Sequence, residues 1–536
     1  MKKLIALSLA LVMMFALAAC GGEGGSESAN DLGNVAGGNK IEWKDEVVNV
    51  EIPEGKAIPD NATHKVTIAS HESWPYDQNW AVWKYIKESI GGDLQVTAIP
   101  SSDFGTKFPL LMTDDENRPD VFGFQGKPSG FSSYCAQGAF VSLDQCEEFM
   151  PDYNAFWDGL PEEDQWMKDT RKTSDGQIYY SPVYGVERST NIRAWLYRKD
   201  IFEKNNLKTP ETMDDLYKVA KKLKALYPDS YPLCMRSGLA NIGVIGCSWK
   251  PNFHYGVYYD FENATWSYGA REETMREIVE FFNKMVREGL VPPNFTTIKA
   301  GEWEELVATN RGFMMPEYQV RMDHFNLPAR KSNPEFTLAV MTPPHADNGV
   351  GIAKVNKYNN DPTGMAICNN NDQARTANAA RYINWFYTDE AAELVSWGKE
   401  GESYSVDAEG KKDYILGTDE KGQTKYGFKT IGTYCRIDPA SIDVAISAEQ
   451  AATTDIILDE YTYEYLDPTL YIQMSDEDST ALSELNTSID AVVQEGISKF
   501  ITGQRSMKEW DAFQQELAGL AIDDVLAIYE KYEVIR

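Results

Sequence analysis

Residues 64–100 read HKVTIASHESWPYDQNWAVWKYIKESIGGDLQVTAIP, and this stretch decides the fold class of the chain. Residues 64–70 form a short apolar run, typical of a strand, that leads into a polar loop. Residues 80–90 repeat apolar side chains at helical spacing and are followed by two glycines, a common helix end. Residues 94–99 alternate as a second strand. We therefore predict a strand, a helix and a strand in close succession.

The same alternation continues along the chain. Residues 119–124 (PDVFGF) indicate a third buried strand. A second series starts near residue 190, with a strand at 194–198 and a helix at 213–227 that Thr212 opens as a capping residue. This succession is typical of α/β halves built on mostly parallel sheets with crossover helices.

Later segments extend both halves. Residues 271–288 form an amphipathic helix, residues 336–342 and 365–368 indicate strands, and residues 372–398 read as one long helix. The tail from residue 476 onward is almost wholly helical.

Residues 177–191 (QIYYSPVYGVERSTN) lie between the two halves and are rich in Tyr, with Pro and Gly. We interpret them as a crossover between lobes, and a long surface loop is the alternative.

The N-terminus carries an export signal. Residues 1–19 join a basic start (MKK), a short apolar core and small residues, and they end before Cys20 in the motif LAAC. The apolar core is shorter than the roughly 20 residues of a membrane span. We expect residues 1–19 to be a lipoprotein signal peptide and Cys20 to be lipidated, with an ordinary signal peptide and a chance cysteine as the alternative. Residues 20–60 then begin with a Gly/Ser-rich stretch, and we expect a flexible tether and an irregular lead-in.

Composition excludes several classes of function. The 536 residues include 51 basic and 82 acidic side chains, for a net charge of −31. Because nucleic-acid binding needs clustered Lys and Arg, this balance argues against it and against broad adhesion to anionic lipid. The length exceeds what one hydrophobic core serves, so two or more domains or lobes are expected.

Cysteine and histidine patterns give no metal or redox motif. Six cysteines remain after Cys20, without a CxxC pair, and the five histidines form no HExxH motif. Disulfides outside the cytoplasm and buried free thiols are both compatible with an even number. The turn from Asp407 through Gly410 to Asp413 offers oxygen ligands but departs from an EF-hand loop, so we interpret it as an ordinary hairpin turn. We expect neither a cofactor nor a metal.

Aromatic residues make up 12% of the chain, with 13 Trp and 29 Tyr. Most of them belong in hydrophobic cores, but Trp74, Tyr76, Trp249 and Tyr255 lie in polar, loop-like contexts. A pyranose presents C–H groups to a ring face and hydroxyls to planar polar partners. Exposed rings in a cleft would therefore suit a sugar.

Several motifs together resemble one bacterial family. LAAC is similar to the lipobox of substrate-binding lipoproteins of ABC importers, and residues 197–226 resemble their R-K-D-x-hydrophobic segment with its downstream P-x-T-x-[DE]-[DE]. RGFMM at 311–315 resembles their G-K-x-A-M strand, and WGKEGESY at 397–404 closely matches the W-G-x-E-G-x-x-Y run of large oligosaccharide-type members. FITG at 500–503 with Trp510 is similar to their C-terminus. The chain thus resembles the family 1 extracellular solute-binding proteins.

The resemblance implies a two-lobed, periplasmic-binding-protein-like (Venus-flytrap) fold with discontinuous lobes and a helical C-terminal region. We place the first lobe at residues 61–185 plus 336–395 and the second at 190–330 plus 400–536. It also implies a monomer, anchored by lipid on the outer face of the cell membrane, that captures an oligosaccharide and delivers it to ABC transporter permease subunits. The chain contains no GxxxxGK[ST] loop, so it is not the ATPase of such a system.

Candidate ligand contacts follow from the strand ends and from the crossover. Ligands of open α/β sheets lie beyond the carboxyl ends of the strands, which favours the loops after residues 70 and 124. We expect ligand contacts from Trp74, Tyr76, Gln125, Tyr184, Glu187, Arg188, Asn191, Arg193, Trp249, Tyr255, Glu317, Trp397 and Glu400. For Trp397, packing at the hinge is the competing interpretation.

Two other functions stay open on the residues alone. A glycoside hydrolase or lyase would need a pair of carboxylates at about 5–10 Å, and 82 acidic residues single out no pair. GxSxG is absent. The same fold could instead bind a peptide or another organic solute. We expect a binding protein rather than an enzyme.

Overall fold

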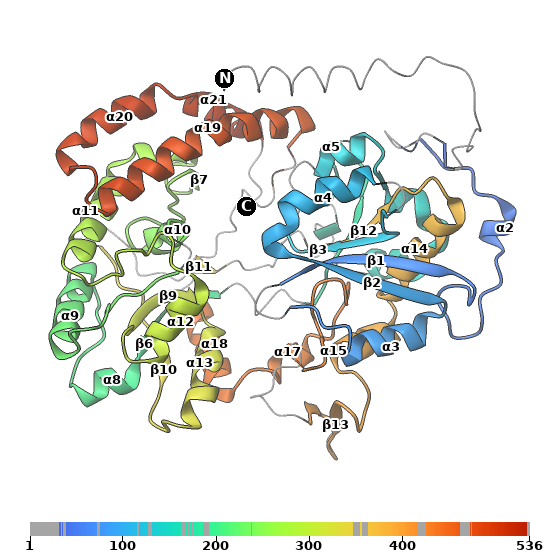
Figure 1. Ribbon diagram of the computed structural model, residues 1–536, viewed down its shortest axis with the longest axis horizontal. Helices are drawn as coiled ribbons and strands as arrows, with labels where there is room; N and C mark the ends of the chain where they lie inside the picture. The colour runs from blue at the N-terminus through green and yellow to red at the C-terminus, as the bar shows by residue number, and fades with distance from the viewer. Residues whose placement is uncertain are drawn as a thin grey trace, which may run out of the picture.

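The chain forms two lobes that lie side by side (Figure 1). The computed structural model describes residues 32–33, 35, 39–71, 75–114, 117–126, 131–161, 167–168, 171–173, 175–185, 192–236, 238–346, 354–355, 363–415, 425–460, 472 and 474–532. The first lobe lies on the right in Figure 1 and the second on the left, where α19, α20 and α21 cover its upper side. The expected two-lobed α/β fold is confirmed.

A six-stranded sheet forms the centre of the first lobe, in the order β2-β1-β3-β12-β4, with β5 also paired to β12. Its strands are β1 (Thr63–Ser70), β2 (Asp93–Pro100), β3 (Val121–Phe124), β4 (Phe140–Val141), β5 (Tyr180–Pro182) and β12 (Gly364–Cys368). β1 pairs in parallel with β2 and β3, whereas β12 is antiparallel to β3, β4 and β5. The strand–helix–strand prediction for residues 64–100 is therefore confirmed, with α3 (Ala81–Ile90) as the helix.

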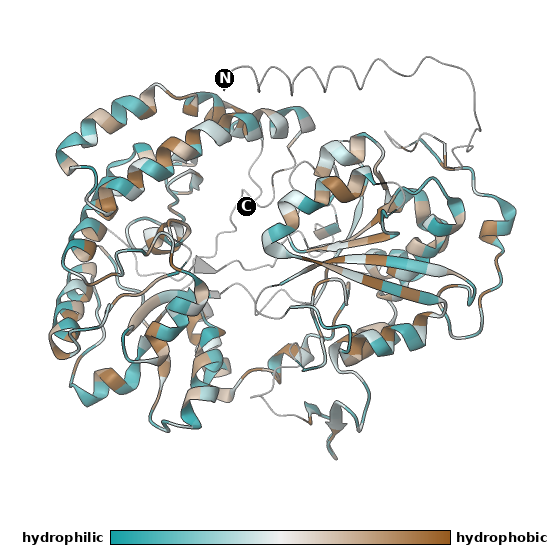
Figure 2. Cartoon of the chain, viewed as in Figure 1, coloured by the Kyte–Doolittle hydropathy of each residue, from teal (hydrophilic) through white to brown (hydrophobic). Residues whose placement is uncertain are grey.

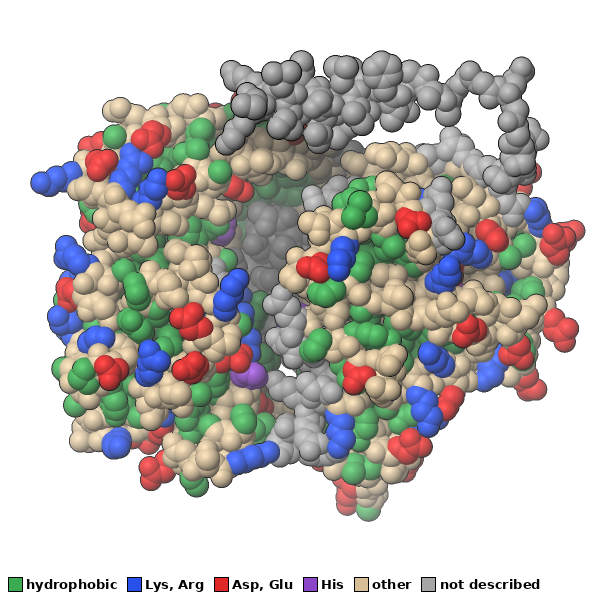
Figure 3. Space-filling view, in the orientation of Figure 1, with side chains coloured by type: hydrophobic (Ala, Val, Ile, Leu, Met, Phe, Trp, Pro, Cys, Tyr) green, Lys and Arg blue, Asp and Glu red, His purple; other side chains and the backbone are tan. Residues whose placement is uncertain are grey.

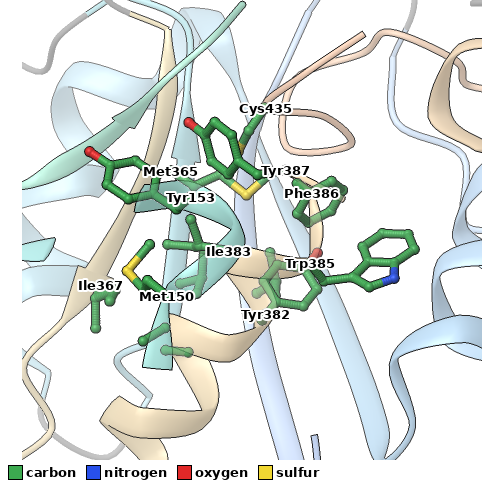
Figure 4. Close-up of a cluster of buried hydrophobic side chains, with 14 of the residues drawn as sticks. Met150, Tyr153, Met365, Ile367, Tyr382, Ile383, Trp385, Phe386, Tyr387 and Cys435 are labelled. Atoms are coloured by element: carbon green, nitrogen blue, oxygen red, sulfur yellow. The ribbon is translucent and has the colours of Figure 1, made fainter. Parts of the chain in front are cut away.

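Amphipathic helices cover this sheet, and Figure 2 shows many helices of both lobes hydrophobic on one side and hydrophilic on the other. α3 buries Val82, Trp83 and Ile86 in the first core. The other helices of this lobe are α2 (Asp45–Val48), α4 (Phe104–Thr113), α5 (Phe131–Ala136), α6 (Pro151–Asp158), α14 (Gln373–Trp385) and α15 (Asp389–Ser396). Figure 4 shows Tyr387 and Cys435, from distant parts of the chain, meeting in the same core.

The second lobe has a different sheet. Its four strands are β6 (Ile192–Arg198), β9 (Met314–Tyr318), β10 (Leu338–Met341) and β11 (Lys354–Val355). β9, β10 and β11 each pair with β6, and every pair is antiparallel. The expectation of a mostly parallel sheet is thus wrong for this lobe, because β6 is the common partner of strands that all run against it.

Helices and two hairpins complete the molecule. The helices of the second lobe are α8 (Lys199–Lys204), α9 (Met213–Leu226), α10 (Ala240–Ile245), α11 (Glu273–Arg287), α12 (Ala300–Ala308), α13 (Arg321–Arg330), α18 (Ala448–Glu460), α19 (Asp476–Ile501), α20 (Trp510–Ala518) and α21 (Ile522–Tyr529). The hairpins pair β7 (Val257–Asp260) with β8 (Thr265–Tyr268), and β13 (Tyr404–Val406) with β14 (Lys412–Tyr414). Thr212 caps α9 as predicted, because its side chain accepts from the N–H of Asp215.

The chain passes between the lobes more than once. It leaves the first sheet after β5 and enters the second at β6, and it returns between β11 and β12. It crosses again after Ile437, which lies in the first core, through α17 (Ala440–Asp443) to Ile457 of α18, which is buried against the second sheet. Within the predicted crossover at residues 177–191, residues 180–182 form β5 of the first sheet and residues 186–191 lie outside the described residues, so the first passage follows β5.

The expected lobe boundaries need two corrections. β10 and β11 both pair with β6, so residues 338–341 and 354–355 belong to the second lobe and not to the first. Phe428, Cys435 and Ile437 are buried in the first core, so residues 400–437 do not begin the second lobe. Long-range packing decides which lobe each of these segments joins, and local sequence patterns do not reveal that packing.

The lead-in before residue 61 is ordered for part of its length. Ile41, Val47 and Ile58 are buried in the first core. The N–H of Ile41 donates to Oε1 of Gln145 at 3.0 Å, so this segment is held on the lobe and is not part of a tether. The predicted helix at 372–398 is two helices, α14 and α15.

Candidate functional site

Five of the predicted functional residues lie outside the described residues. They are Cys20, Trp74, Glu187, Arg188 and Asn191. Their roles stay predictions.

Two candidates of the first lobe follow the carboxyl ends of its parallel strands. Gln125 comes directly after β3 and is exposed. Tyr76 is half-buried after β1, where its N–H donates to Oγ of Ser70 at 2.8 Å. The ring of Tyr76 packs edge-on against Trp80 and Trp83. Both residues therefore lie at the edge where parallel strands present ligand-binding loops.

Tyr184 lies on the first crossing between the lobes. Its N–H donates to the carbonyl of Cys435 at 2.8 Å, and its carbonyl accepts from the N–H of Ile437 at 3.1 Å. Its ring packs against Phe156 and Trp157 of α6. Two crossing segments are thus bonded to each other beside the first core.

Glu317 and Arg193, both predicted, meet on neighbouring strands of the second lobe. The register places Ala194 opposite Glu317 and Arg193 opposite Tyr318. Nη1 of Arg193 lies 3.2 Å from Oε1 of Glu317. The guanidinium of Arg193 lies 3.5 Å from the ring centroid of Tyr318, a cation–π contact.

Arg236 also forms an ion pair with Glu317, and the sequence patterns did not indicate this residue. Its Nε and Nη2 donate to Oε2 at 2.5 Å and Oε1 at 3.0 Å, which makes a bidentate pair. Arg236 directly follows the buried run from Leu233 to Met235, which lies beside β9. A charged residue at the end of a buried apolar run is the signal that could have found it.

Arg321, the first residue of α13, lies next to this pair. Its Nη1 donates to Oε1 of Glu304 at 3.1 Å, and Nε2 of His324 lies 3.1 Å from the same oxygen. Arg236 and Arg321 each lie 5.6 Å from the ring of Trp303. Burial first, and then the charge of Arg236, lowers the pKa of Arg321. We call Arg193, Arg236, Arg321 and Glu317 the Glu317 cluster.

Trp397 occupies a different environment, in the first lobe. It is 1% exposed, and its Nε1 donates to Oδ2 of Asp438 at 2.8 Å. Its ring packs against Tyr404 and Tyr414. Because no face of the ring is open, the structure favours the packing interpretation over ligand contact.

The WGKEGESY motif around Trp397 has a structural explanation. Gly398 has a φ of +83°, and a Cβ there would lie 2.2 Å from Oγ of Ser403. That hydroxyl donates to the carbonyl of Trp397 at 2.6 Å. Glu400 is exposed on the turn. The motif therefore specifies a tight turn that closes over the tryptophan.

Lys429 lies beside this turn and is half-buried. Its Nζ donates to the hydroxyl of Tyr414 at 2.8 Å and to the carbonyl of Ser441 at 3.0 Å. Burial lowers the pKa of Lys429 to about 7, and the charge of Asp438 acts in the opposite direction. We call Trp397, Tyr414, Lys429 and Asp438 the Trp397 cluster.

The two remaining aromatic candidates pack against the second core. Trp249 is 9% exposed and makes an edge contact with Phe281. Tyr255 is half-buried and stacks on His254 at 4.4 Å. Burial raises the pKa of Tyr255. Neither residue is brought near the Glu317 cluster by any described contact.

The candidate metal turn is a hairpin turn, as expected. Oδ1 of Asp407 accepts from the N–H of Glu409 and of Lys411, between β13 and β14. In the described part of the chain, no three His, Cys, Asp or Glu side chains gather as a metal site would require.

The six cysteines Cys135, Cys146, Cys234, Cys247, Cys368 and Cys435 are buried and are thiols rather than disulfides. This decides the alternative that the sequence left open. No helix within the described ranges has the length and apolarity to cross a membrane.

Comparisons with known proteins agree with this geometry. Residues 76–393 match the model of the bacterial extracellular solute-binding protein family. Lipoprotein LipO of Bacillus subtilis (strain 168) is 27% identical over 246 residues, which cover 42% of this chain and 44% of LipO. The chain therefore matches less than half of the length of that relative.

Two solved structures share the fold over nearly their whole length. The alginate-binding protein AlgQ2, solved without calcium ion, has a TM-score of 0.74 at 20% identity and covers 89% of this chain and 99% of its own. The ABC-transporter substrate-binding protein FusA of S. pneumoniae, in complex with kestose, has a TM-score of 0.69 at 18% identity and covers 88% and 98%. With a family model that matches more than half of its residues, the chain belongs to the bacterial extracellular solute-binding proteins.

Proposed function

We propose that this protein captures an oligosaccharide outside the cell and delivers it to the permease of an ABC importer. The observation that carries the proposal is the pair of α/β lobes joined by repeated crossings, with charged and aromatic side chains at the start of β6, where the first crossing ends. Figure 3 shows the surface hollowed between the lobes. A ligand held there would contact both lobes and favour their closed arrangement.

Membership in a solute-binding family supports binding over catalysis. The names of two neighbours in fold, an alginate-binding protein and a protein in complex with kestose, support a saccharide over a peptide. Alginate carries carboxylates and kestose does not, so the charge of the sugar must be inferred from the side chains of this chain.

We further propose that a lipid on Cys20 holds the protein at the outer face of the cell membrane. The LAAC motif supports this, and so does the resemblance to a lipoprotein. Cys20→Ala should release the protein from the membrane fraction or block its processing. A variant that stays membrane-bound and is processed like the parent would contradict the anchor.

A thermal-shift screen of the mature protein against oligosaccharides, peptides and other small solutes tests the ligand class. A binding ligand raises the stability of the folded state by RT ln(1 + [L]/Kd), about 2.7 kcal/mol at a hundredfold excess over Kd. We expect a saccharide to give the shift and to reduce the radius of gyration in X-ray scattering. Stabilisation by a peptide alone would support the other ligand class.

The enzyme alternative has its own test. The saccharide that binds should be recovered unchanged after long incubation with purified protein. Steady product formation that one Asp or Glu substitution abolishes would replace binding by glycan cleavage.

A further inference from the structure

Three arginines from separate elements meet around one buried carboxylate. Arg193 comes from β6, Arg236 follows the buried run beside β9, and Arg321 begins α13. Glu317 is 1% exposed and accepts from both Arg193 and Arg236. One carboxylate therefore holds two guanidinium groups in place, with the third beside them.

The cluster has more positive than negative charge. Within the described residues, Glu317 and Glu304 are the carboxylates paired with the three arginines, which leaves one cation in excess. An arginine stays protonated under all ordinary conditions. Since the whole chain carries a net charge of −31, this local excess runs against its composition. After burial, the positive charge of Arg236 lowers the pKa of Arg321, because the two guanidiniums lie close together.

The arginines keep donors beyond those that their partners use. Each guanidinium has five N–H donors in a planar fork. Towards Glu317 and Glu304, Arg193 uses Nη1, Arg236 uses Nε and Nη2, and Arg321 uses Nη1. Their side chains are 14–19% exposed, so each reaches solvent while packed rings and the carboxylate fix its direction. Such preorganised donors bind an anion with little further loss of side-chain entropy.

The position of the cluster fits a ligand between the lobes. Arg193 is the second residue of β6, directly after the first crossing, and it pairs with Tyr318 at the end of β9. Figure 3 shows Lys and Arg side chains on the second lobe along the border of the hollow. A neutral sugar offers hydroxyls, which need no excess charge, whereas a carboxylate matches the fork of an arginine.

We propose that the Glu317 cluster binds the carboxylate of a uronic acid unit, so that the ligand is an acidic oligosaccharide. This inference rests on the proposed function and narrows its substrate class. Glu317 acts as the positioning residue that orders the arginines, and the arginines contact the ligand.

Calorimetry with paired probes tests the inference on the wild-type protein. The probes are trisaccharides of galacturonate, mannuronate and guluronate, their methyl esters, and a panel of neutral oligosaccharides. We expect at least one uronate trisaccharide to bind, and its methyl ester to bind at least tenfold more weakly. The affinity for the acid should also fall as salt rises, because charge contributes to it.

Variants then assign the effect to the cluster. Arg193→Gln should weaken uronate binding at least tenfold and reduce the difference between acid and ester. If Arg193→Gln alone disturbs folding, the double variant Arg193→Gln/Glu317→Gln restores the charge balance and is expected to show the same loss. Arg505→Gln is the matched control, because Arg505 is 16% exposed and pairs with Glu516 on the helical tail. It should leave binding unchanged.

The outcomes separate the two proposals. Binding of neutral oligosaccharides but no uronate, or equal binding of an acid and its ester, overturns the inference and leaves the proposed function standing. Binding of no saccharide in either set contradicts both. Uronate binding that Arg193→Gln does not affect places the acid elsewhere and overturns the assignment to this cluster.

Discussion

The Glu317 cluster and the Trp397 cluster both combine aromatic rings with charged groups, yet they differ in how those groups are satisfied. In the Trp397 cluster, the indole N–H of Trp397 donates to Asp438, and Nζ of Lys429 donates to Tyr414 and Ser441. In the Glu317 cluster, arginines outnumber their carboxylates and stay partly exposed. A closed network stabilises a fold, and an open, unbalanced one is suited to a ligand. Similar residue types in both places thus serve different purposes.

Trp397→Ala gives the largest expected effect. Removing a buried tryptophan costs about 3–5 kcal/mol of unfolding free energy, and Asp438 also loses a donor. Urea denaturation measures this loss, and ligand affinity of the variant that remains folded should be unchanged. Trp397→Phe, which keeps an aromatic ring, should lose less. Unchanged stability together with lost affinity would instead make Trp397 a ligand platform and remove the contrast between the clusters.

Glu317→Gln tests the opposite region. It keeps the shape of the side chain but leaves the neighbouring arginines without their buried carboxylate. Breaking a buried ion pair costs about 3–5 kcal/mol of unfolding free energy. We expect a loss of about 3 kcal/mol here, because the arginines retain some hydration. Thermal unfolding measures the change, and Glu516→Gln, in the half-exposed pair with Arg505, is a control expected to cost about 0–1 kcal/mol. Equal effects of both variants would contradict the central role given to Glu317.

Lys429 gives the Trp397 cluster a pH dependence. Its pKa is about 7 in the folded protein and near its ordinary value of 10.5 when unfolded, so between these values the unfolded chain binds the extra proton. Stability must then rise with pH, by up to about 1.4 kcal/mol per pH unit from this group. Denaturation of the wild type and of Lys429→Met from pH 7 to 9 measures the difference between them. A wild type that gains nothing relative to Lys429→Met would show that the lysine stays charged.

Thiol labelling is expected to give the smallest signal. Burial raises the pKa of Cys435, in the first core, and of Cys234, in the core against the second sheet, to about 12 for each. Both should react slowly with a thiol reagent at pH 8 until the protein unfolds. Mass spectrometry of the labelled protein tells the sites apart. Rapid labelling of Cys435 alone would reveal local opening of residues 425–437 and would show that the Trp397 cluster is not closed.

Local pattern was sufficient to predict much of the secondary structure. The strands of residues 64–100, the helix between them and the cap at Thr212 follow from periodicity and capping chemistry, which depend on residues a few positions apart. Strand ends and the crossover singled out Glu317 and Arg193 as separate ligand-contact candidates, and the register of β6 with β9 then brought the two together.

Tertiary structure alone decided which sheet or core each of these segments joins and which distant residues pair. Residues 338–341 belong to the second sheet because they pair with β6, and Phe428, Cys435 and Ile437 belong to the first core because their apolar side chains are buried there. Arg236 reached Glu317 across 81 residues, a contact that no local spacing encodes. The sequence by itself determined two α/β halves, a binding family and half of the charged cluster. The fold decided which aromatic motif is buried and which charges stay open, because burial depends on everything that packs around a residue.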